Sequence, residues 1–324
     1  MSPLLLGVDG GATKTVALIA DEAGNVLGAG RAGSSDIHSE VEPGQAVARV
    51  AAAVHEAARG AGVDPAELGS CVFSLCGADW PEDVDFYAAA LSERLALRKT
   101  PTVMNDAFGA LRAGTRDGVG AALVLGTGAA IAARGPAGSA WFSGERMEPS
   151  GAMEFGRRAY ELLIRGEYGP GPVPGFLDTA LKAFEVSSVE ALVHLIMKRG
   201  GSGRRSLTRL APILLEAGHG GDPQARPIIT EHGVLLAGYL RAAARRVSLG
   251  EQGSTVVIAG GVFRHDCTDL IETVTEGLAG FRLKHSAAEP VYGVVLAAGD
   301  EQGDRPSLER LTETGPGQPF FHTL

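Results

Sequence analysis

A glycine-rich polar turn between two apolar runs constrains the fold of this chain most, and it occurs twice. The first turn joins residues 4–8 to 15–19, and the second joins 119–125 to 129–133; they read Asp9-Gly10-Gly11-Ala12-Thr13-Lys14 and Gly126-Thr127-Gly128. Such runs around a turn predict a β-hairpin, and adjacent glycines let main-chain N–H groups converge on a phosphate. One copy alone is equally compatible with an ordinary flexible turn. Two copies indicate a duplicated architecture.

The order of predicted elements also starts again at the second turn. Three strand-like runs, a helix, a buried strand, a helix and a strand precede residue 112, and strands 119–125, 129–133 and 140–142 then repeat the opening. A length of 324 residues also favours two domains. We therefore predict domains at 1–112 and 113–301, a helical insertion at about 152–250, and a loosely ordered, Pro- and Gly-rich tail at 302–324.

The composition limits the partners. With 45% hydrophobic residues, a net charge of -9 and no apolar run of membrane-spanning length, the chain predicts no nucleic-acid and no membrane partner. The N-terminus lacks a secretory pattern, so a cytoplasmic location is expected. The three cysteines have no metal-ligand spacing and are interpreted as buried small hydrophobes: Cys71, Cys76 and Cys267.

Polar side chains follow two predicted strands at the ends where open α/β sheets bind ligands. Cys76-Gly77-Ala78-Asp79 follows the strand at 71–75, and Asn105-Asp106 follows the strand at 102–104. Asp79 and Asp106 each have an alternative interpretation as helix caps, since each precedes a predicted helix. The polar loop Ser34-Ser35-Asp36-Ile37-His38 adds further hydrogen-bonding groups.

Taken in order, these motifs resemble the actin-like ATPase superfamily, which includes hexokinases, chaperone ATPases and actin. Within it the chain is most similar to the BadF/BadG/BcrA/BcrD ATPase family, which includes N-acetylglucosamine kinases. The matching segments are residues 7–15, Asn105-Asp106-Ala107, Gly126-Thr127-Gly128 and Ala259-Gly260-Gly261-Val262-Phe263. The resemblance implies an α/β fold of two actin-like ATPase (ribonuclease H-like) domains, each a mixed sheet flanked by helices, with an ATP cleft between them.

The resemblance also assigns roles at the site. It implies that Asp106 is the general base and that Asp9 holds Mg²⁺ through water. The ATP phosphates would be bound by Gly10, Gly11, Thr13, Lys14, Gly126, Thr127 and Gly128, and the adenosine by Gly260 and Gly261. For the sugar the candidates are Ser35, Asp36, His38, Gly77, Asp79, Asn105 and Glu154.

One segment departs from the family. Its kinases carry Gly-Asp-Glu-Gly-Ser after the second phosphate loop, and the Asp helps to hold the amino sugar. Residues 147–156 here read MEPSGAMEFG, where Glu154 offers the replacement carboxylate. The identity of the sugar therefore stays open.

The leading prediction is an ATP-dependent kinase that transfers the γ-phosphate to a hydroxyl of a small-molecule sugar or amino sugar, with N-acetylglucosamine or glucosamine first. For the oligomeric state of this chain, a homodimer is one candidate. An alternative is an ATPase of the 2-hydroxyacyl-CoA dehydratase activator type, which activates a partner enzyme. In that case Cys71 and Cys76 would be the candidate ligands of an iron–sulfur cluster. A non-catalytic sugar-binding regulator is the third, although no DNA-binding helix pair with a basic face is visible.

Overall fold

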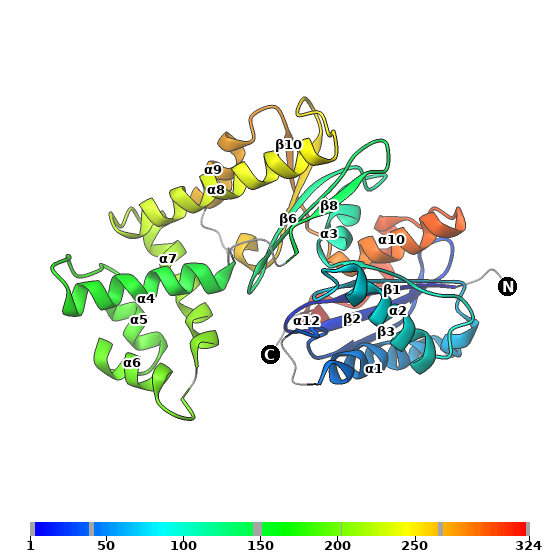
Figure 1. The fold of residues 1–324 in the computed structure, drawn as a ribbon, viewed down its shortest axis with the longest axis horizontal. Helices are drawn as coiled ribbons and strands as arrows, with labels where there is room; N and C mark the ends of the chain where they lie inside the picture. The colour runs from blue at the N-terminus through cyan, green and yellow to red at the C-terminus, as the bar shows by residue number, and fades with distance from the viewer. Residues whose placement is uncertain (1–3, 39–41, 145–150, 202, 265–267, 322–324) are drawn as a thin grey trace.

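The computed structural model describes residues 4–38, 42–144, 151–201, 203–264 and 268–321. It consists of two five-stranded mixed sheets flanked by helices (Figure 1). This arrangement confirms the predicted fold class. Within the described ranges, no helix combines the length and apolar character needed to cross a bilayer.

The two sheets share one topology. The first has the order β3-β2-β1-β4-β5 and the second has the order β8-β7-β6-β9-β10. In each, two antiparallel pairs are followed by two parallel pairs. The strands are β1 (Leu5–Gly10), β2 (Thr15–Ala20), β3 (Val26–Ala32), β4 (Ser70–Leu75), β5 (Thr102–Asn105), β6 (Gly120–Leu125), β7 (Ala129–Arg134), β8 (Ala140–Phe142), β9 (Thr255–Ala259) and β10 (Arg282–His285).

Both predicted glycine turns are therefore hairpin tips. Gly10 pairs with Thr15 where β1 meets β2, and Leu125 pairs with Ala129 where β6 meets β7. Each hairpin supplies the central strand of its sheet, since β1 also pairs with β4 and β6 also pairs with β9. The two tips thus extend from the middle of the two sheets.

Helices α1 (Pro43–Ala61) and α2 (Pro81–Arg94) cover one face of the first sheet. The α1 helix begins at a proline, whose fixed φ suits the first helical turn, and it ends at Gly62 with φ 69°. Its valines at three- and four-residue spacing, Val47, Val50 and Val54, are buried against the sheet. Each such side chain stabilises the fold by about 1.5–3 kcal/mol.

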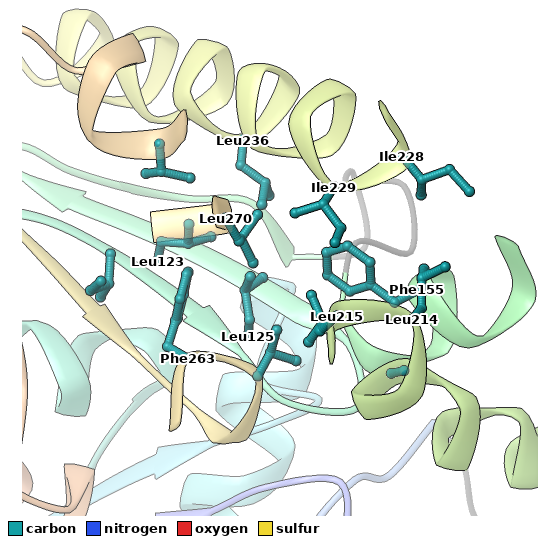
Figure 2. Packing of buried hydrophobic residues seen from close by; sticks show 14 of the residues in the cluster. Leu123, Leu125, Phe155, Leu214, Leu215, Ile228, Ile229, Leu236, Phe263 and Leu270 are labelled. Carbon is teal, nitrogen blue, oxygen red and sulfur yellow. The ribbon is translucent and has the colours of Figure 1, made fainter. Parts of the chain in front are cut away.

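The predicted helical insertion lies on the second sheet. Figure 2 shows its core, where Leu123 and Leu125 of β6 lie below Leu236, and Phe155 lies beside Leu215. The helices that build this side are α4 (Ala152–Tyr168), α5 (Leu177–Ala183), α6 (Val189–Met197), α7 (Leu210–His219), α8 (Ala225–Arg246) and α9 (Asp269–Gly277). Short 3-10 helices occupy Pro65–Glu67, Arg204–Arg209 and Gly261–Arg264.

Two helices pack across the predicted domain boundary. The α3 helix (Ala107–Gly114) follows the first sheet but buries Phe108 and Leu111 against the second. Conversely, α10 (Pro290–Gln302), which the sequence placed in the second domain, packs on the first sheet. The helices touch where an added Cβ on Gly293 would lie 2.0 Å from the carbonyl oxygen of Gly109. They form a shared layer between the two sheets (Figure 1).

The predicted loose tail is wrong in its described part. Residues beyond α10 form α11 (Leu308–Thr314) and α12 (Gln318–Phe321), and Leu311 and Phe321 are buried against the face of the first sheet that α10 covers. The main-chain N–H of Val26 donates to Thr314 Oγ1 at 2.9 Å. Apolar side chains set among the prolines and glycines hold this segment in place.

Candidate active site

The two hairpin tips face one crevice, which consists of two adjoining pockets. The α7 pocket has a volume of about 450 Å³ and is named for Ala211, Pro212 and Leu215 of its wall. The β5 pocket has a volume of about 370 Å³ and is named for Asn105 and Asp106 at the end of β5. The two pockets share part of their lining: Asp9, Thr13, Lys14, Val124, Gly126, Thr127 and Pro290. Both predicted phosphate loops thus lie in the same crevice.

The second tip is open toward the crevice and braced from behind. A Cβ added to Gly126 or to Gly128 would meet nothing within 4 Å. The main-chain N–H groups of Ala152 and Met153, at the start of α4, donate to the carbonyl oxygens of Gly126 and Thr127 at 2.9 and 3.0 Å. These bonds turn the loop carbonyls toward α4. An anion in the crevice therefore meets the open glycine face of the loop, while the first N–H groups of α4 hold that loop in place from behind.

The first tip uses its two glycines differently. The N–H of Gly11 donates to the carbonyl of Lys14 at 2.8 Å, which closes the turn. A Cβ on Gly10 would lie 2.5 Å from Ser35 Oγ, so a packed neighbour requires glycine here. Gly11, Thr13 and Lys14 line the crevice, whereas Gly10 lies just behind it. The resemblance-based role of Gly10 is therefore a packing role in this structure.

Asp106 lines the β5 pocket, and its side chain does not cap a helix. The N–H of Ala107 at the start of α3 donates instead to Asn105 Oδ1 at 3.1 Å, and Asn105 Nδ2 donates to Asp79 Oδ1 at 3.0 Å. Burial and the charge of Asp79 raise the pKa of Asp106 to about 7. A carboxylate with that pKa exchanges protons near neutrality, as a general base requires.

Asp79 is also not the helix cap that the sequence allowed. Asp83 Oδ2 accepts the N–H groups of Asp79 and Trp80 at 3.3 and 3.0 Å, at the start of α2. Asp79 is buried, lines the β5 pocket and accepts the Asn105 amide. It therefore fixes Asn105 beside the candidate base.

Asp9 and Lys14 connect the two pockets. Burial and the charge of Asp106 raise the pKa of Asp9 to about 7, although the Lys14 ammonium acts in the opposite direction. Mg²⁺ in proteins is bound by one or two carboxylates together with substrate phosphates and waters. A half-buried carboxylate between two phosphate loops fits such an ion, which would also offset the repulsion from Asp106.

Three residues that the sequence did not single out surround Lys14. Glu289 is only 5% exposed, and its carboxylate lies 3.5 Å from Lys14 Nζ and 2.6 Å from Arg264 Nη2. Lys14 Nζ also donates to the main-chain oxygen of Phe321. Arg264, Glu289 and Phe321 line the α7 pocket. The sequence signal for Glu289 is only its place directly before the proline that starts a helix. Its role becomes clear only from its ion pairs with residues distant in the chain.

The adenosine candidates also lie in the α7 pocket. Gly260 has φ +103°, and an added Cβ would be 2.3 Å from the carbonyl oxygen of Leu125, so only glycine fits there. A Cβ on Gly261 would meet nothing within 4 Å. Together with the apolar α7 wall, these residues form a surface on which a planar base can lie.

The sugar candidates divide into two groups. Asp36, Gly77, Asp79 and Asn105 line the β5 pocket. Ser35, His38 and Glu154 do not belong to the lining that the structure describes. Ser35 is fully buried behind Gly10, His38 Nε2 lies 3.3 Å from Asp83 Oδ2, and Glu154 pairs with Arg157.

The cysteines and the segment 147–156 lie only partly within the described residues. Cys71 is buried, whereas Cys76 is half-buried and lines the β5 pocket, and neither forms a disulfide with a described residue. Cys267 lies outside the described residues. Of the departing segment 147–156, residues 147–150 also lie outside them, and 152–156 form the first turns of α4.

Comparisons with known proteins show which family and which fold this chain resembles. The model of the BadF/BadG/BcrA/BcrD ATPase family matches residues 6–138. An N-acetyl-D-glucosamine kinase of Dictyostelium discoideum is 21% identical over 310 residues, which cover 91% of this chain and 97% of the relative.

Solved structures share the fold over both domains. A protein of Chromobacterium violaceum, provisionally named N-acetylglucosamine kinase, aligns with a TM-score of 0.70 and 21% identity, covering 92% of this chain and 99% of its own. A ROK family glucokinase of Streptomyces griseus, solved with glucose and AMPPNP, aligns with a TM-score of 0.55 and 18% identity, covering 92% and 98%. Residues 6–138 therefore match the BadF/BadG/BcrA/BcrD ATPase family, and the chain as a whole has the two-domain actin-like ATPase fold.

Proposed function

We propose that this protein is an ATP-dependent sugar kinase whose acceptor is an amino sugar, with N-acetylglucosamine or glucosamine first. The observation that carries the proposal is the position of Asp106 in the same crevice as both glycine loops. Support for the substrate class comes from the relative in Dictyostelium discoideum that is named an N-acetyl-D-glucosamine kinase.

In this proposal the α7 pocket receives the adenosine and the β5 pocket receives the sugar. The lining that the pockets share, from Asp9 and Lys14 to Thr127, then surrounds the β- and γ-phosphates. Phosphoryl transfer requires mainly that reactants be positioned and that charge be stabilised. In this proposal the Lys14 ammonium, the Thr13 and Thr127 hydroxyls and the open face of the second glycine loop supply these.

The chemical step follows from this placement. The Asp106 carboxylate accepts the proton of the acceptor hydroxyl while that oxygen forms a bond to the γ-phosphorus. The bond from the γ-phosphorus to the bridging oxygen breaks, and ADP retains the electron pair. Bound Mg²⁺ supplies charge neutralisation at the phosphates. Asn105, held by Asp79, orients the sugar beside the base.

A coupled assay for ADP release tests the proposal across hexoses, amino sugars and N-acetylated sugars. We expect the highest kcat/KM with N-acetylglucosamine or glucosamine. Asp106→Asn should lower kcat by about 10²–10⁴-fold, the usual contribution of a general base. Its affinity for a non-hydrolysable ATP analogue should stay within a few-fold of the parent protein.

Asp85→Asn is the matched control, because Asp85 is an exposed carboxylate on α2 outside the crevice. Sugar phosphorylation at the parental rate in Asp106→Asn would refute the base assignment. ADP release that no sugar stimulates would refute the kinase.

A further inference from the structure

A second cavity lies at the opposite ends of the two helices that separate the sheets. It has a volume of about 700 Å³ and belongs to neither pocket of the crevice. The C-terminal parts of α3 and α10 line it with Arg112 and Asp300, whereas Asp106 and Pro290, at the other ends of these helices, lie in the crevice. From Pro290 to Asp300 the helix advances about 15 Å.

The cavity is basic on a protein that is acidic overall. Four cationic side chains and two carboxylates line it, and the chain as a whole carries a net charge of -9. The charged lining consists of Arg112, Arg116, Lys284, Arg305, Asp117 and Asp300. A concentrated positive field in a concave site attracts small anions from a surface that otherwise repels them.

Two of these four cations already have hydrogen-bond partners within the protein. Arg112 is largely buried and forms a bidentate pair with Asp300 at 2.7 and 3.0 Å, and Lys284 Nζ donates to the carbonyl of Gly114 at 3.0 Å. By contrast, Arg116 and Arg305 form no hydrogen bond or ion pair with any residue that the structure describes. Two guanidinium groups are therefore available at a preformed basic wall.

We propose that this cavity binds a phosphate-bearing small molecule, with Arg116 and Arg305 as the principal phosphate ligands. Guanidinium groups bind phosphate oxygens with paired, charge-assisted hydrogen bonds. A cavity of about 700 Å³ accommodates a phosphorylated sugar, since small-molecule sites span about 300–1,000 Å³. Its concave shape and the acidic remainder of the surface favour such a ligand over a nucleic acid.

The position of the ligands connects the site to the crevice. Arg116 follows α3, which packs on the second sheet, whereas Arg305 precedes α11, which packs on the first. A bound phosphate would thus contact both domains and stabilise their present arrangement. This part of the inference rests on the proposed function, whereas the binding itself does not.

Isothermal titration of the full chain tests binding, with hexose 6-phosphate, inorganic phosphate and the unphosphorylated hexose as probes. The cleft is first saturated with sugar and a non-hydrolysable ATP analogue, so that product cannot bind there. We expect hexose 6-phosphate to bind and unphosphorylated hexose not to bind. Binding of inorganic phosphate alone would identify the phosphate, rather than the sugar, as the recognised group.

The variants Arg116→Ala/Arg305→Ala and Arg59→Ala/Arg199→Ala remove equal charge from exposed positions, and only the first pair lines the cavity. The first variant should bind at least about tenfold more weakly, because two charge-assisted contacts are lost, and the second should bind like the parent protein. Equal affinity in both variants, or no phosphate binding with the cleft filled, would overturn the proposal. Neither readout depends on sugar phosphorylation, so failure of the kinase assignment is seen separately.

Discussion

Two carboxylates in the crevice have ionisation properties unlike those of ordinary aspartates. Burial raises the pKa of both Asp9 and Asp106 to about 7, and neighbouring negative charges act in the same direction. Because the two groups interact, protons leave the pair in macroscopic steps. With a pKa of about 7, the Asp106 carboxylate thus becomes mostly charged only as the pH rises through neutrality.

The pH dependence of kcat/KM reports this ionisation. A general base acts when deprotonated, so kcat/KM should rise with pH and level off above about pH 7, where the Asp106 carboxylate is charged. A steady-state profile on the free enzyme measures the limb. A plateau that extends down to about pH 5 would show that the base has the pKa of an ordinary aspartate.

The same shift has a consequence for stability. The folded-state pKa of Asp106 lies above its unfolded value, so the folded protein binds more protons, and stability falls as pH rises from the unfolded pKa to the folded one. Asp106→Asn removes this loss. Its Tm should exceed that of the parent protein by at least about 3 °C above pH 7 and should match it near pH 4. Thermal melts in apo buffer measure the difference, and a gap independent of pH would contradict the assigned cause.

Glu289 is the buried partner of two cations from different domains, and we expect it to position Lys14. In Glu289→Gln the side chain keeps its shape, but the ammonium and the Arg264 guanidinium lose their counter-charge. We predict that kcat falls about tenfold, because an ill-placed charge stabilises the transition state less. The KM for ATP should not rise, since the phosphates meet more net positive charge.

Glu251→Gln is the control, because it removes the charge from a more exposed ion pair, with Arg241, outside the crevice. A rise in the KM for ATP with unchanged kcat would show that Glu289 acts in binding alone.

At the scale of elements, the short α12 helix connects the C-terminal segment to the first phosphate loop. Phe321 is buried, its ring centroid lies 5.9 Å from Lys14 Nζ, and its main-chain oxygen accepts a hydrogen bond from that ammonium. Phe321→Ala should destabilise the protein by about 3 kcal/mol, at the lower end for buried phenylalanines because α12 is a single short helix.

The half-buried Phe320 provides the matched comparison, and Phe320→Ala should cost clearly less. Urea unfolding measures both values, and the KM for ATP should rise only in Phe321→Ala. Equal small effects of the two substitutions would show that α12 is not anchored to the loop.

The local elements were largely predictable from the sequence, whereas their partners were not. The hairpins around residues 10–14 and 126–128 follow from strand runs and glycines, and Asp106 follows from its place after a strand. Helix α3 packs on the second sheet and α10 on the first. The apolar periodicity of a helix does not say which sheet it will cover, so the sequence could not predict this arrangement. The Glu289 pairing joins residues far apart in the chain, and the packing of the tail depends on a few apolar side chains within a Pro- and Gly-rich composition.

For the whole molecule, exclusion of water from the crevice is what would distinguish a sugar kinase from an enzyme that only hydrolyses ATP. If closure around a sugar excludes water, hydrolysis of ATP without sugar should be at least about 10²-fold slower than transfer to the sugar. A sugar analogue without the acceptor hydroxyl should accelerate hydrolysis. Measuring phosphate and sugar phosphate in parallel decides the matter, because an ATPase that activates a partner would hydrolyse ATP equally well with no sugar present.

The exchange of α3 and α10 has a consequence for how the chain can be divided. Cutting the polypeptide between the sheets, after residue 115, would leave each half with an uncovered apolar sheet face and one apolar helix that lacks the sheet it packs on. Neither half should be an autonomous folding unit, and each should aggregate when produced alone. When the two halves are produced together, we expect each to supply the helix that covers the other's sheet. The two fragments should then complement each other and restore the complete fold.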